Sequence, residues 1–389
     1  METTADAVVI GGGILGASTA HFLAKRGFGK VVLLEKHALA SASTGHSAAN
    51  VRTYYSNPVT AQLAWRGVQM FENDLEELGG DSGFQQVGFL LLLDESTSAT
   101  GDQILRTERE NGVEVQDLPS KDIGEVAPQL DLEGVVRATF EPRSGYADPV
   151  KTTRNLVERA KDWGLSAYEG VGATGIRSEG DRISAVETDD GLVQTPVVVN
   201  AAGPWGRRVG LWVGQNDSIR WSRESDLVIQ LPREFGKSPV VSDPALRFYF
   251  RPQGDDTMMA GLGFPKEVEP MDIDDYDQEL DPVSRQRILE PLRRRVPSLR
   301  QAKFLHGWAS VYTITDDWHP LVGPVPGLQG YYDCYGGSGH SFKLGPAIGE
   351  SLADVIAGDT PKIDIRPLRP TRFMEGEPIT SAWGSGNRA

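Results

Sequence analysis

The sequence has little from which to build a disulfide framework or a metal site. Cys334 is its only cysteine, which excludes an internal disulfide and a thiolate metal cluster. Its six histidines show neither HxxxH nor HExxH spacing, so no zinc site is predicted. We therefore expect the protein to use neither a structural disulfide nor a bound metal.

Long apolar runs and an excess of basic residues are also missing. No apolar stretch approaches the ~20 residues that cross a bilayer, and the N-terminus lacks the charged region and cleavage site of a signal peptide. The chain has 39 Lys and Arg against 54 Asp and Glu, a formal net charge of −15, which disfavours nucleic-acid and anionic-lipid surfaces. We expect a cytoplasmic protein that binds neither nucleic acid nor membrane. Its oligomeric state is left open.

Glycine, in contrast, is abundant, with 44 residues, and three consecutive glycines, Gly11 to Gly13, interrupt an apolar run near the start of the chain. The apolar run Ala7–Ile10 predicts a buried strand, and a helical spacing of apolar residues follows the glycines. Gly11, Gly13 and Gly16 thus form G-x-G-x-x-G on a strand-to-helix turn, and Glu35 ends the next apolar run. In this arrangement backbone N–H groups approach a pyrophosphate and the acid binds a ribose. The pattern predicts a dinucleotide site and disfavours NADP, but it does not separate FAD from NAD.

The chain alternates between two kinds of segment. We predict an α/β fold, with a Rossmann-type nucleotide-binding domain assembled from three separated segments and a second, mainly antiparallel β domain formed by two insertions. A ligand would bind between the two domains. The nucleotide-binding segments are residues 1–86, 145–220 and 306–372; the insertions are 87–144 and 221–305; the polar residues 373–389 are predicted to form a disordered tail.

A glycine-rich stretch near the C-terminal end distinguishes FAD from NAD. Residues 336–346, with the sequence GGSGHSFKLGP, resemble the flavin-closing loop of the D-amino-acid oxidase family, and more narrowly its sarcosine oxidase and dimethylglycine dehydrogenase branch. The resemblance covers nearly the whole chain through GGGILG with Glu35, STGHSAANVR, YADP, VVVNAAGPW and the hairpin RFYFRP…MMAGLG. It implies bound FAD, with the loop stabilising the pyrimidine edge of the reduced flavin through N–H groups at a helix start.

The motifs and the resemblance together predict which residues contact FAD. They lie in the first glycine turn, at the end of the second strand, in the loop after it, on two later strands and in the glycine-rich loop: Gly11, Gly13, Ile14, Leu15, Gly16, Glu35, Lys36, Ser43, Thr44, Gly45, His46, Ser47, Ala48, Ala173, Ala201, Ala202, Gly203, Trp205, Gly337, Ser338, Gly339, His340, Ser341 and Lys343.

The attachment of the flavin has two alternatives. In the sarcosine and dimethylglycine dehydrogenases a histidine at about the place of His46 carries the flavin covalently. Here Gly45 replaces the aromatic residue that precedes that histidine, which favours a hydrogen-bonded or packed His46. The cysteine that tethers flavin in monomeric sarcosine oxidases corresponds to Ser310, which excludes that bond. Cys334 is expected to be a core residue.

Four residues form the predicted substrate group. By resemblance to the monomeric sarcosine oxidases, Arg52 and Lys343 match the two cations that bind the amino-acid carboxylate, and Tyr312 matches a tyrosine that lines the site. The alternatives are a surface ion pair for Arg52, a solvent-facing position for Lys343 and simple packing for Tyr312. Met259 takes the place of the lysine that helps oxygen react in the oxidases, and Ala49 that of an arginine.

The resemblance implies FAD-dependent oxidation of a small amino acid or N-methyl amino acid. A hydride would pass to flavin N5 and leave an imine that water hydrolyses, without a dedicated protein base. The electron acceptor would be oxygen or another carrier, and the replaced cations make a dehydrogenase a serious alternative to an oxidase. Two other functions stay open: oxidation of a 2-hydroxy acid, and a flavin-binding subunit of a larger complex.

Overall fold

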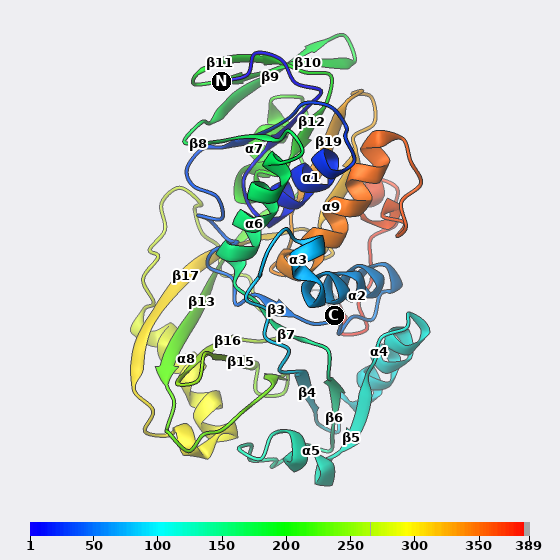
Figure 1. Cartoon of the computed structure of the whole chain (residues 1–389). Coiled ribbons are helices and arrows are strands. Elements are labelled where there is room, and N and C mark those ends of the chain that lie inside the picture. The colour runs from blue at the N-terminus through cyan, green and yellow to red at the C-terminus, as the bar shows by residue number, and fades with distance from the viewer. Residues whose placement is uncertain (265, 385–389) are drawn as a thin grey trace.

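The protein is built on two large sheets, one above the other in Figure 1. A computed structural model describes residues 1–264 and 266–384. The first sheet has the strand order β18-β19-β12-β1-β2-β8, and its strands run parallel except for β18, which is antiparallel to β19. Its strands are β1 (Ala7–Ile10), β2 (Val31–Glu35), β8 (Ser166–Glu169), β12 (Val198–Asn200), β18 (Leu321–Pro324) and β19 (Tyr331–Tyr335).

This first sheet is covered on both faces. Helix α1 (Ile14–Lys25) packs between α6 (Pro149–Lys161) and α9 (Ser341–Ala357), while the hairpins of β9 (Ala173–Glu179), β10 (Arg182–Thr188) and β11 (Gly191–Gln194) contribute to the core on the other face. Burial on both faces explains why β1 and β2 are almost purely apolar. The predicted strand–turn–helix–strand unit is confirmed.

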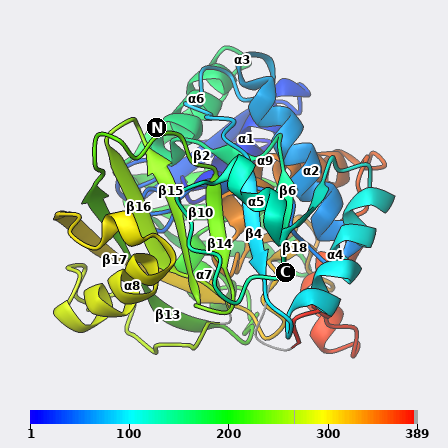
Figure 2. The same cartoon turned by 90° about the horizontal axis from the view of Figure 1, so that it is seen from below.

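The second sheet is mainly antiparallel and has eight strands in the order β17-β13-β16-β15-β14-β4-β6-β5. Its strands are β4 (Phe89–Leu93), β5 (Gln116–Pro119), β6 (Arg137–Glu141), β13 (Arg220–Gln230), β14 (Val240–Asp243), β15 (Phe248–Gln253), β16 (Thr257–Leu262) and β17 (Phe304–Ile314). Helix α8 (Pro282–Arg295) packs on β13, β15 and β16, as the view from below shows (Figure 2).

The remaining elements connect and flank the two sheets. Helix α2 begins after the N-cap Asn57, whose side chain accepts a hydrogen bond from the Val59 N–H at 3.1 Å, as the Asn-Pro pair predicts. The other elements are β3 (Asn50–Val51), α2 (Pro58–Glu72), α3 (Asp74–Glu77), α4 (Ser98–Glu110), α5 (Ser120–Val126), β7 (Gly145–Tyr146) and α7 (Gly206–Leu211).

Two details differ from the sequence analysis. The boundary predicted at residue 306 falls inside β17, which pairs with β13 along its length and therefore belongs to the second sheet. The predicted disorder of residues 373–389 is wrong for residues 373–384. The Ile379 N–H donates to Asp317 Oδ2 at 2.9 Å, and the Ala382 N–H donates to Ser56 Oγ at 2.9 Å. The polar composition of the segment gives no indication of these two hydrogen bonds. Residues 385–389 lie outside the described residues.

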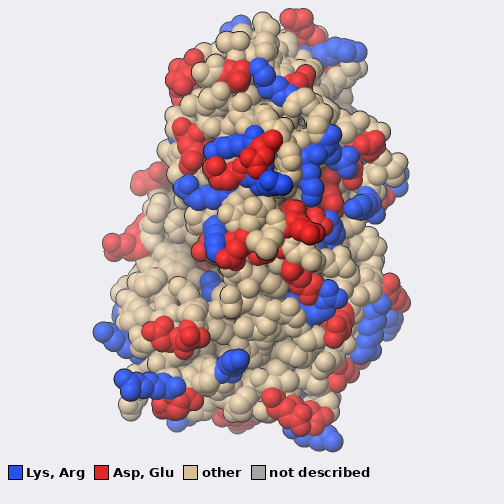
Figure 3. Space-filling view, viewed as in Figure 1, with Lys and Arg blue, Asp and Glu red and all other residues tan. Residues whose placement is uncertain are grey.

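Charged side chains of both signs occur over much of the visible face of the protein, with a broad uncharged area in its lower half (Figure 3). Within residues 1–264 and 266–384, no helix is both long enough and apolar enough to span a membrane. The same residues contain no cluster of three or more His, Cys, Asp or Glu arranged to hold a metal ion.

Candidate functional site

A cavity of about 430 Å³ lies between the two sheets. On one side it is bounded by the carboxyl ends of β1, β2 and β12 and by the glycine-rich loop before α9; on the other it is bounded by β13 and β17. The carboxyl ends of parallel strands are where open α/β sheets bind their ligands. Its location agrees with the predicted site between two domains.

The first glycine turn has the geometry that a pyrophosphate requires. Gly11 has φ +110°, and a Cβ added there would lie 2.3 Å from the Ala201 carbonyl oxygen. A Cβ on Gly16 would lie 1.9 Å from the Gly11 carbonyl oxygen, so helix and strand pack too closely for any side chain. Gly13 is the N-cap of α1 and provides no side-chain cap. The start of α1 therefore faces the cavity with its positive dipole end.

The far end of the cavity suits an adenosine ribose. Glu35 lines the cavity, and its carboxylate accepts the Gly12 N–H at 2.7 Å and the His37 N–H at 2.8 Å. Lys36 Nζ lies 3.3 Å from the centroid of the Trp205 ring. The backbone thus fixes the carboxylate at the position where it would accept ribose hydroxyls.

The loop after β2 gives the cavity a wall of small residues. Gly45 is required by packing, because its Cβ would lie 2.3 Å from the Ala40 carbonyl oxygen. His46 lines the cavity; its Nδ1 lies 3.0 Å from the Ala42 carbonyl oxygen, and its own carbonyl accepts the Trp308 Nε1–H at 3.1 Å. These contacts hold His46 in place, and covalent attachment to flavin stays the less favoured of the two alternatives.

The glycine-rich loop opposite is shaped by left-handed residues. Ser338 has φ +47° and Gly339 has φ +79°, while a Cβ on Gly337 would lie 1.5 Å from Ser341 Oγ. The sequence pattern predicts a helix from Leu344, but helix α9 begins earlier, at Ser341. Its N-cap residue, His340, makes no side-chain hydrogen bond to the first turn of the helix. A second helix start therefore faces the same cavity.

Most of the predicted FAD contacts are brought together. Of those 24 residues only Gly16, Gly45, His340 and Lys343 do not line the large cavity: the two glycines lie behind it, and the other two line a smaller cavity. The second sheet contributes a further wall, in which the sequence analysis placed only Ser310 and Tyr312 and missed Glu224, Asp226, Val311 and Thr313. Only strand register, which no local motif encodes, places these residues there.

The smaller cavity has a volume of about 70 Å³ and is lined by three of the four residues of the predicted substrate group. It is lined by Arg52, Lys343 and Tyr312, and it shares wall residues with the large cavity: Ser47, Ala48, Tyr312, Gly339 and Phe342. Arg52 is 7% exposed and Lys343 is 5% exposed. Neither cation therefore lies at the surface, which excludes the alternative positions for both.

Aromatic and backbone groups hold the two cations. Arg52 Nη1 donates to the Tyr54 carbonyl oxygen at 2.7 Å, and its Cζ lies 4.9 Å from the centroid of the Tyr55 ring. Lys343 Nζ lies 5.8 Å from the same ring, whose hydroxyl is 3.0 Å from His340 Nδ1. The planar guanidinium of Arg52 matches a carboxylate, and the ammonium of Lys343 in the same wall offers a second positive charge.

A buried pair of acids lies behind Arg52. The Thr53 N–H donates to Glu141 Oε2 at 2.8 Å, and Thr53 Oγ1 donates to Glu108 Oε1 at 3.0 Å. Burial, followed by repulsion from Glu141, raises the pKa of Glu108 well above its ordinary value. At a given pH this pair therefore carries less negative charge near Arg52 than two ordinary carboxyls would.

A pair of hydrogen-bonded side chains, Asp226 and Tyr249, lies between the two cavities. Asp226 lines the large cavity and accepts a short hydrogen bond from the Tyr249 hydroxyl, which lines the small one. Burial raises the pKa of Asp226 to about 6. Glu224 forms an ion pair with Lys266, whose Nζ lies 4.7 Å from the centroid of the Tyr312 ring. The sequence analysis found none of these four residues.

Met259 does not occupy the predicted position over the flavin. It is 4% exposed on β16 and lines neither cavity. Its register partners are Val228 on β13 and Arg251 on β15. The Arg251 Nε–H donates to the Ala48 carbonyl oxygen at 2.6 Å. Met259 thus packs within the sheet, two residues along from the strand position that faces Asp226.

Comparisons with known proteins agree with this site. Residues 6–355 match the family described as FAD dependent oxidoreductase. Mitochondrial sarcosine dehydrogenase of Mus musculus is 29% identical over 98% of this chain and 43% of its own length. Mitochondrial dimethylglycine dehydrogenase of Homo sapiens is 29% identical over 95% of this chain and 44% of its own. The chain therefore spans less than half the length of these two relatives.

A solved structure extends the agreement to the fold. The L-proline dehydrogenase of P. horikoshii is 28% identical, with a TM-score of 0.90 that covers 97% of this chain and 100% of the other. At this coverage the match extends over both sheets.

Proposed function

Because the chain belongs to the family of FAD-dependent oxidoreductases, we propose that it oxidises a small amino acid or N-methyl amino acid. The observation that carries this proposal is the position of Arg52 and Lys343 in a small buried cavity that shares a wall with the cavity for FAD. Small ligands gain their orientation from a few placed polar groups in an otherwise apolar pocket. The relatives named for sarcosine, dimethylglycine and proline support the same substrate class.

The two cations orient the substrate. Its carboxylate would lie against the guanidinium of Arg52 and the ammonium of Lys343, which offer a planar fork and a point charge. Tyr312 and Ala48 line both cavities, so a carbon next to the amine would lie at the junction between them. FAD bound in the large cavity supplies the hydride acceptor. Because the protein holds the substrate in a fixed orientation against FAD, the reaction avoids most of the entropic cost of bringing two free molecules together.

Asp226 and Tyr249 provide a route for the proton of the substrate ammonium. A protonated amine has no lone pair to form the imine, so one N–H bond must break before hydride leaves carbon. The Tyr249 hydroxyl already donates to Asp226, so it would take the ammonium proton as its own moves to the Asp226 carboxylate. The sequence analysis expected no protein base; this pair is the candidate that the fold adds.

The acceptor that reoxidises the flavin is proposed to be a carrier rather than oxygen. The charged residues that β13 and β17 contribute to the wall of the large cavity are Glu224 and Asp226, and Lys266 compensates the charge of Glu224. Asp226 is therefore the acid that bears on the charge of this wall. Reaction with oxygen passes through a negatively charged species that a nearby cation would stabilise and an anion would not. Met259 lines neither cavity and contributes no charge there.

A substrate panel under anaerobic conditions tests the proposed function. The flavin absorbance should bleach with sarcosine, dimethylglycine, proline or glycine, and a trapping assay should detect the imine or its hydrolysis products. Bleaching by lactate or glycolate alone would support oxidation of a 2-hydroxy acid instead. A yellow protein that no member of the panel bleaches would contradict the proposal and favour a flavin-binding subunit.

A further inference from the structure

The segment after α9 returns to the substrate cavity. In Figure 1 the chain after α9, coloured red, descends toward the level of α2, between the two sheets. Trp383 lines the small cavity together with Arg52 and Lys343. Its ring lies 6.4 Å from that of Tyr54, whose backbone carbonyl accepts the Arg52 guanidinium. One wall of the cavity is therefore supplied by a segment distant in sequence from its other walls.

A buried ion pair anchors this segment. Arg372 is fully buried and donates to both oxygens of Asp317, through Nε at 2.7 Å and Nη2 at 2.8 Å. Asp317 also accepts the Ile379 N–H at 2.9 Å. Arg369 forms a further ion pair with Glu377. The segment is thus fixed at several points before it reaches the cavity.

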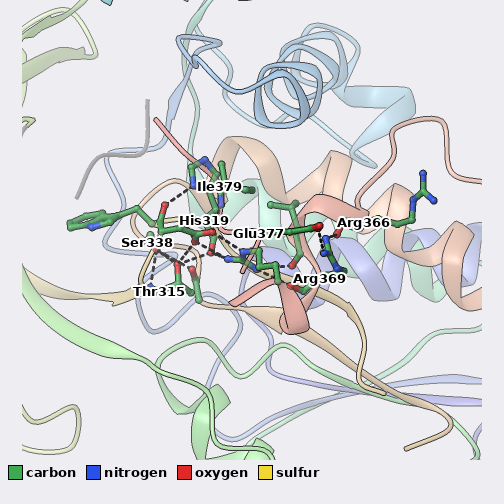
Figure 4. A network of polar contacts seen from close by, with 12 residues as sticks. Thr315, His319, Ser338, Arg366, Arg369, Glu377 and Ile379 are labelled. Carbon is green, nitrogen blue, oxygen red and sulfur yellow. Dashed lines mark hydrogen bonds and ion pairs between the residues drawn. The ribbon is translucent and has the colours of Figure 1, made fainter. Parts of the chain in front are cut away.

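The same network reaches the glycine-rich loop, as the close view shows (Figure 4). The His319 carbonyl accepts Arg372 Nη2 and Thr315 Oγ1, both at 2.7 Å. The Thr315 N–H donates to Ser338 Oγ at 3.3 Å, and Ser338 lines the large cavity. The placement of Trp383 is therefore tied to the loop that closes over the cofactor.

We propose that Trp383 determines substrate specificity by limiting the size of the group attached to the substrate's amine or α-carbon. The inference rests on the proposed function, since it concerns the same carboxylate site. A rigid indole beside a cavity of about 70 Å³ leaves room only for a compact amino acid. The Asp317–Arg372 pair acts as a positioning element, because it holds the segment rather than contacting the ligand.

The test compares carboxylates of increasing size by their perturbation of the flavin spectrum. Acetate, isobutyrate and benzoate are titrated into the FAD-loaded wild type, Trp383→Phe and Trp383→Ala. The affinity ratio of benzoate to acetate should rise stepwise, by about 10-fold or more in Trp383→Ala, as expected when a pocket loses a steric boundary. Met374→Ala is the matched control: this residue of the same segment is 82% exposed and should leave the ratio unchanged.

The outcomes distinguish the role of Trp383 from the proposed function of the protein. A wild type that responds to acetate, with an unchanged benzoate-to-acetate ratio in both Trp383 variants, overturns the role of Trp383 and leaves the proposed function intact. A wild type that responds to no carboxylate overturns the proposed function and this inference with it. If Trp383→Ala fails to bind FAD, Trp383→Phe and Asp317→Asn still decide: both should raise the ratio, and an unchanged ratio in both contradicts the proposal.

Discussion

At the scale of single residues, Asp226 combines burial with a position at the junction of the two cavities. Burial raises its pKa to about 6, and the carboxylate form alone accepts a proton. The proton acceptor therefore forms as pH rises through about 6. The same shift means that the folded state binds this proton more tightly than the unfolded state, so its contribution to stability is lost as pH rises through the folded pKa.

Activity should follow the ionisation of Asp226. We expect kcat/KM for the amine substrate to rise with pH across a limb near 6, and Asp226→Asn to remove this limb and lower kcat by about 100-fold, the lower end of what a positioned base contributes. Tyr249→Phe should lower kcat without removing FAD. Asp255→Asn, in the exposed turn between β15 and β16, is the control. An Asp226→Asn enzyme with the wild-type pH profile would contradict this role.

The reactivity of the Cys334 thiol tests the packing around α1. It is fully buried, with Sγ 3.9 Å from Thr19 Oγ1, which confirms the prediction of a core residue. Burial raises the pKa of its thiol to about 12, so little reactive thiolate exists near pH 8. We expect a thiol reagent to leave the native protein unmodified and to modify one thiol per chain after denaturation. Rapid modification of the native protein would contradict the described packing.

At the scale of elements, two glycines at the turn between β1 and α1 have different roles: Gly13 leaves space for FAD, whereas Gly16 allows the helix and the strand to pack together. A Cβ on Gly13 would meet only Thr44 Oγ1, at 3.1 Å, whereas a Cβ on Gly16 would lie 1.9 Å from the Gly11 carbonyl oxygen. Gly13→Val should therefore fold but weaken FAD binding by at least about 10-fold, or 1.4 kcal/mol, because its side chain occupies the pyrophosphate position. Gly16→Val should lower the melting temperature of the apoprotein as well. Full FAD retention by folded Gly13→Val would refute the assignment.

The same elements show what sequence reasoning could predict. The glycine turn was predictable because its steric demands fall within one strand, one turn and one helix. The start of α9 was placed too late, because Gly345 and Pro346 are poor helix formers and tertiary packing fixes this turn: a Cβ on Gly345 would lie 2.8 Å from Ile14 of α1. Trp383 was missed because the segment that carries it is polar and is ordered by distant partners.

Strand register explains why the sequence analysis missed Asp226 and Tyr249. Asp226 pairs with Gly261, which pairs with Tyr249, and this chain of partners brings the acid and the phenol together. Three strands must align before the pair exists, and a shift by one residue would turn both side chains to the opposite face. No single stretch of sequence contains that information. Arg52 and Lys343 were found because they adjoin recognisable loops.

At the scale of the whole molecule, the two sheets form opposite walls of the cofactor cavity, and each wall contributes different groups. The first sheet presents two helix starts to the cofactor cavity, and the second contributes acids beside it. We expect the reduced enzyme to be reoxidised more slowly by air than by an artificial acceptor dye, since the Asp226 carboxylate disfavours the negative charge that forms on oxygen. Stopped-flow mixing measures both rates. Rapid and complete reoxidation by air would contradict the proposed acceptor.

The central claim is that Arg52 and Lys343 hold the substrate carboxylate beside the flavin. The most direct test is the anaerobic rate of flavin bleaching by an N-methyl amino acid and by its methyl ester, in wild type, Arg52→Met and Lys343→Met. A charge-assisted hydrogen bond contributes about 1.5–3 kcal/mol, so each variant should lower the efficiency with the acid by about 10- to 150-fold. The ester should react poorly with wild type and change little in either variant. If both FAD-loaded variants bleach with the acid as efficiently as wild type, the carboxylate clamp is wrong.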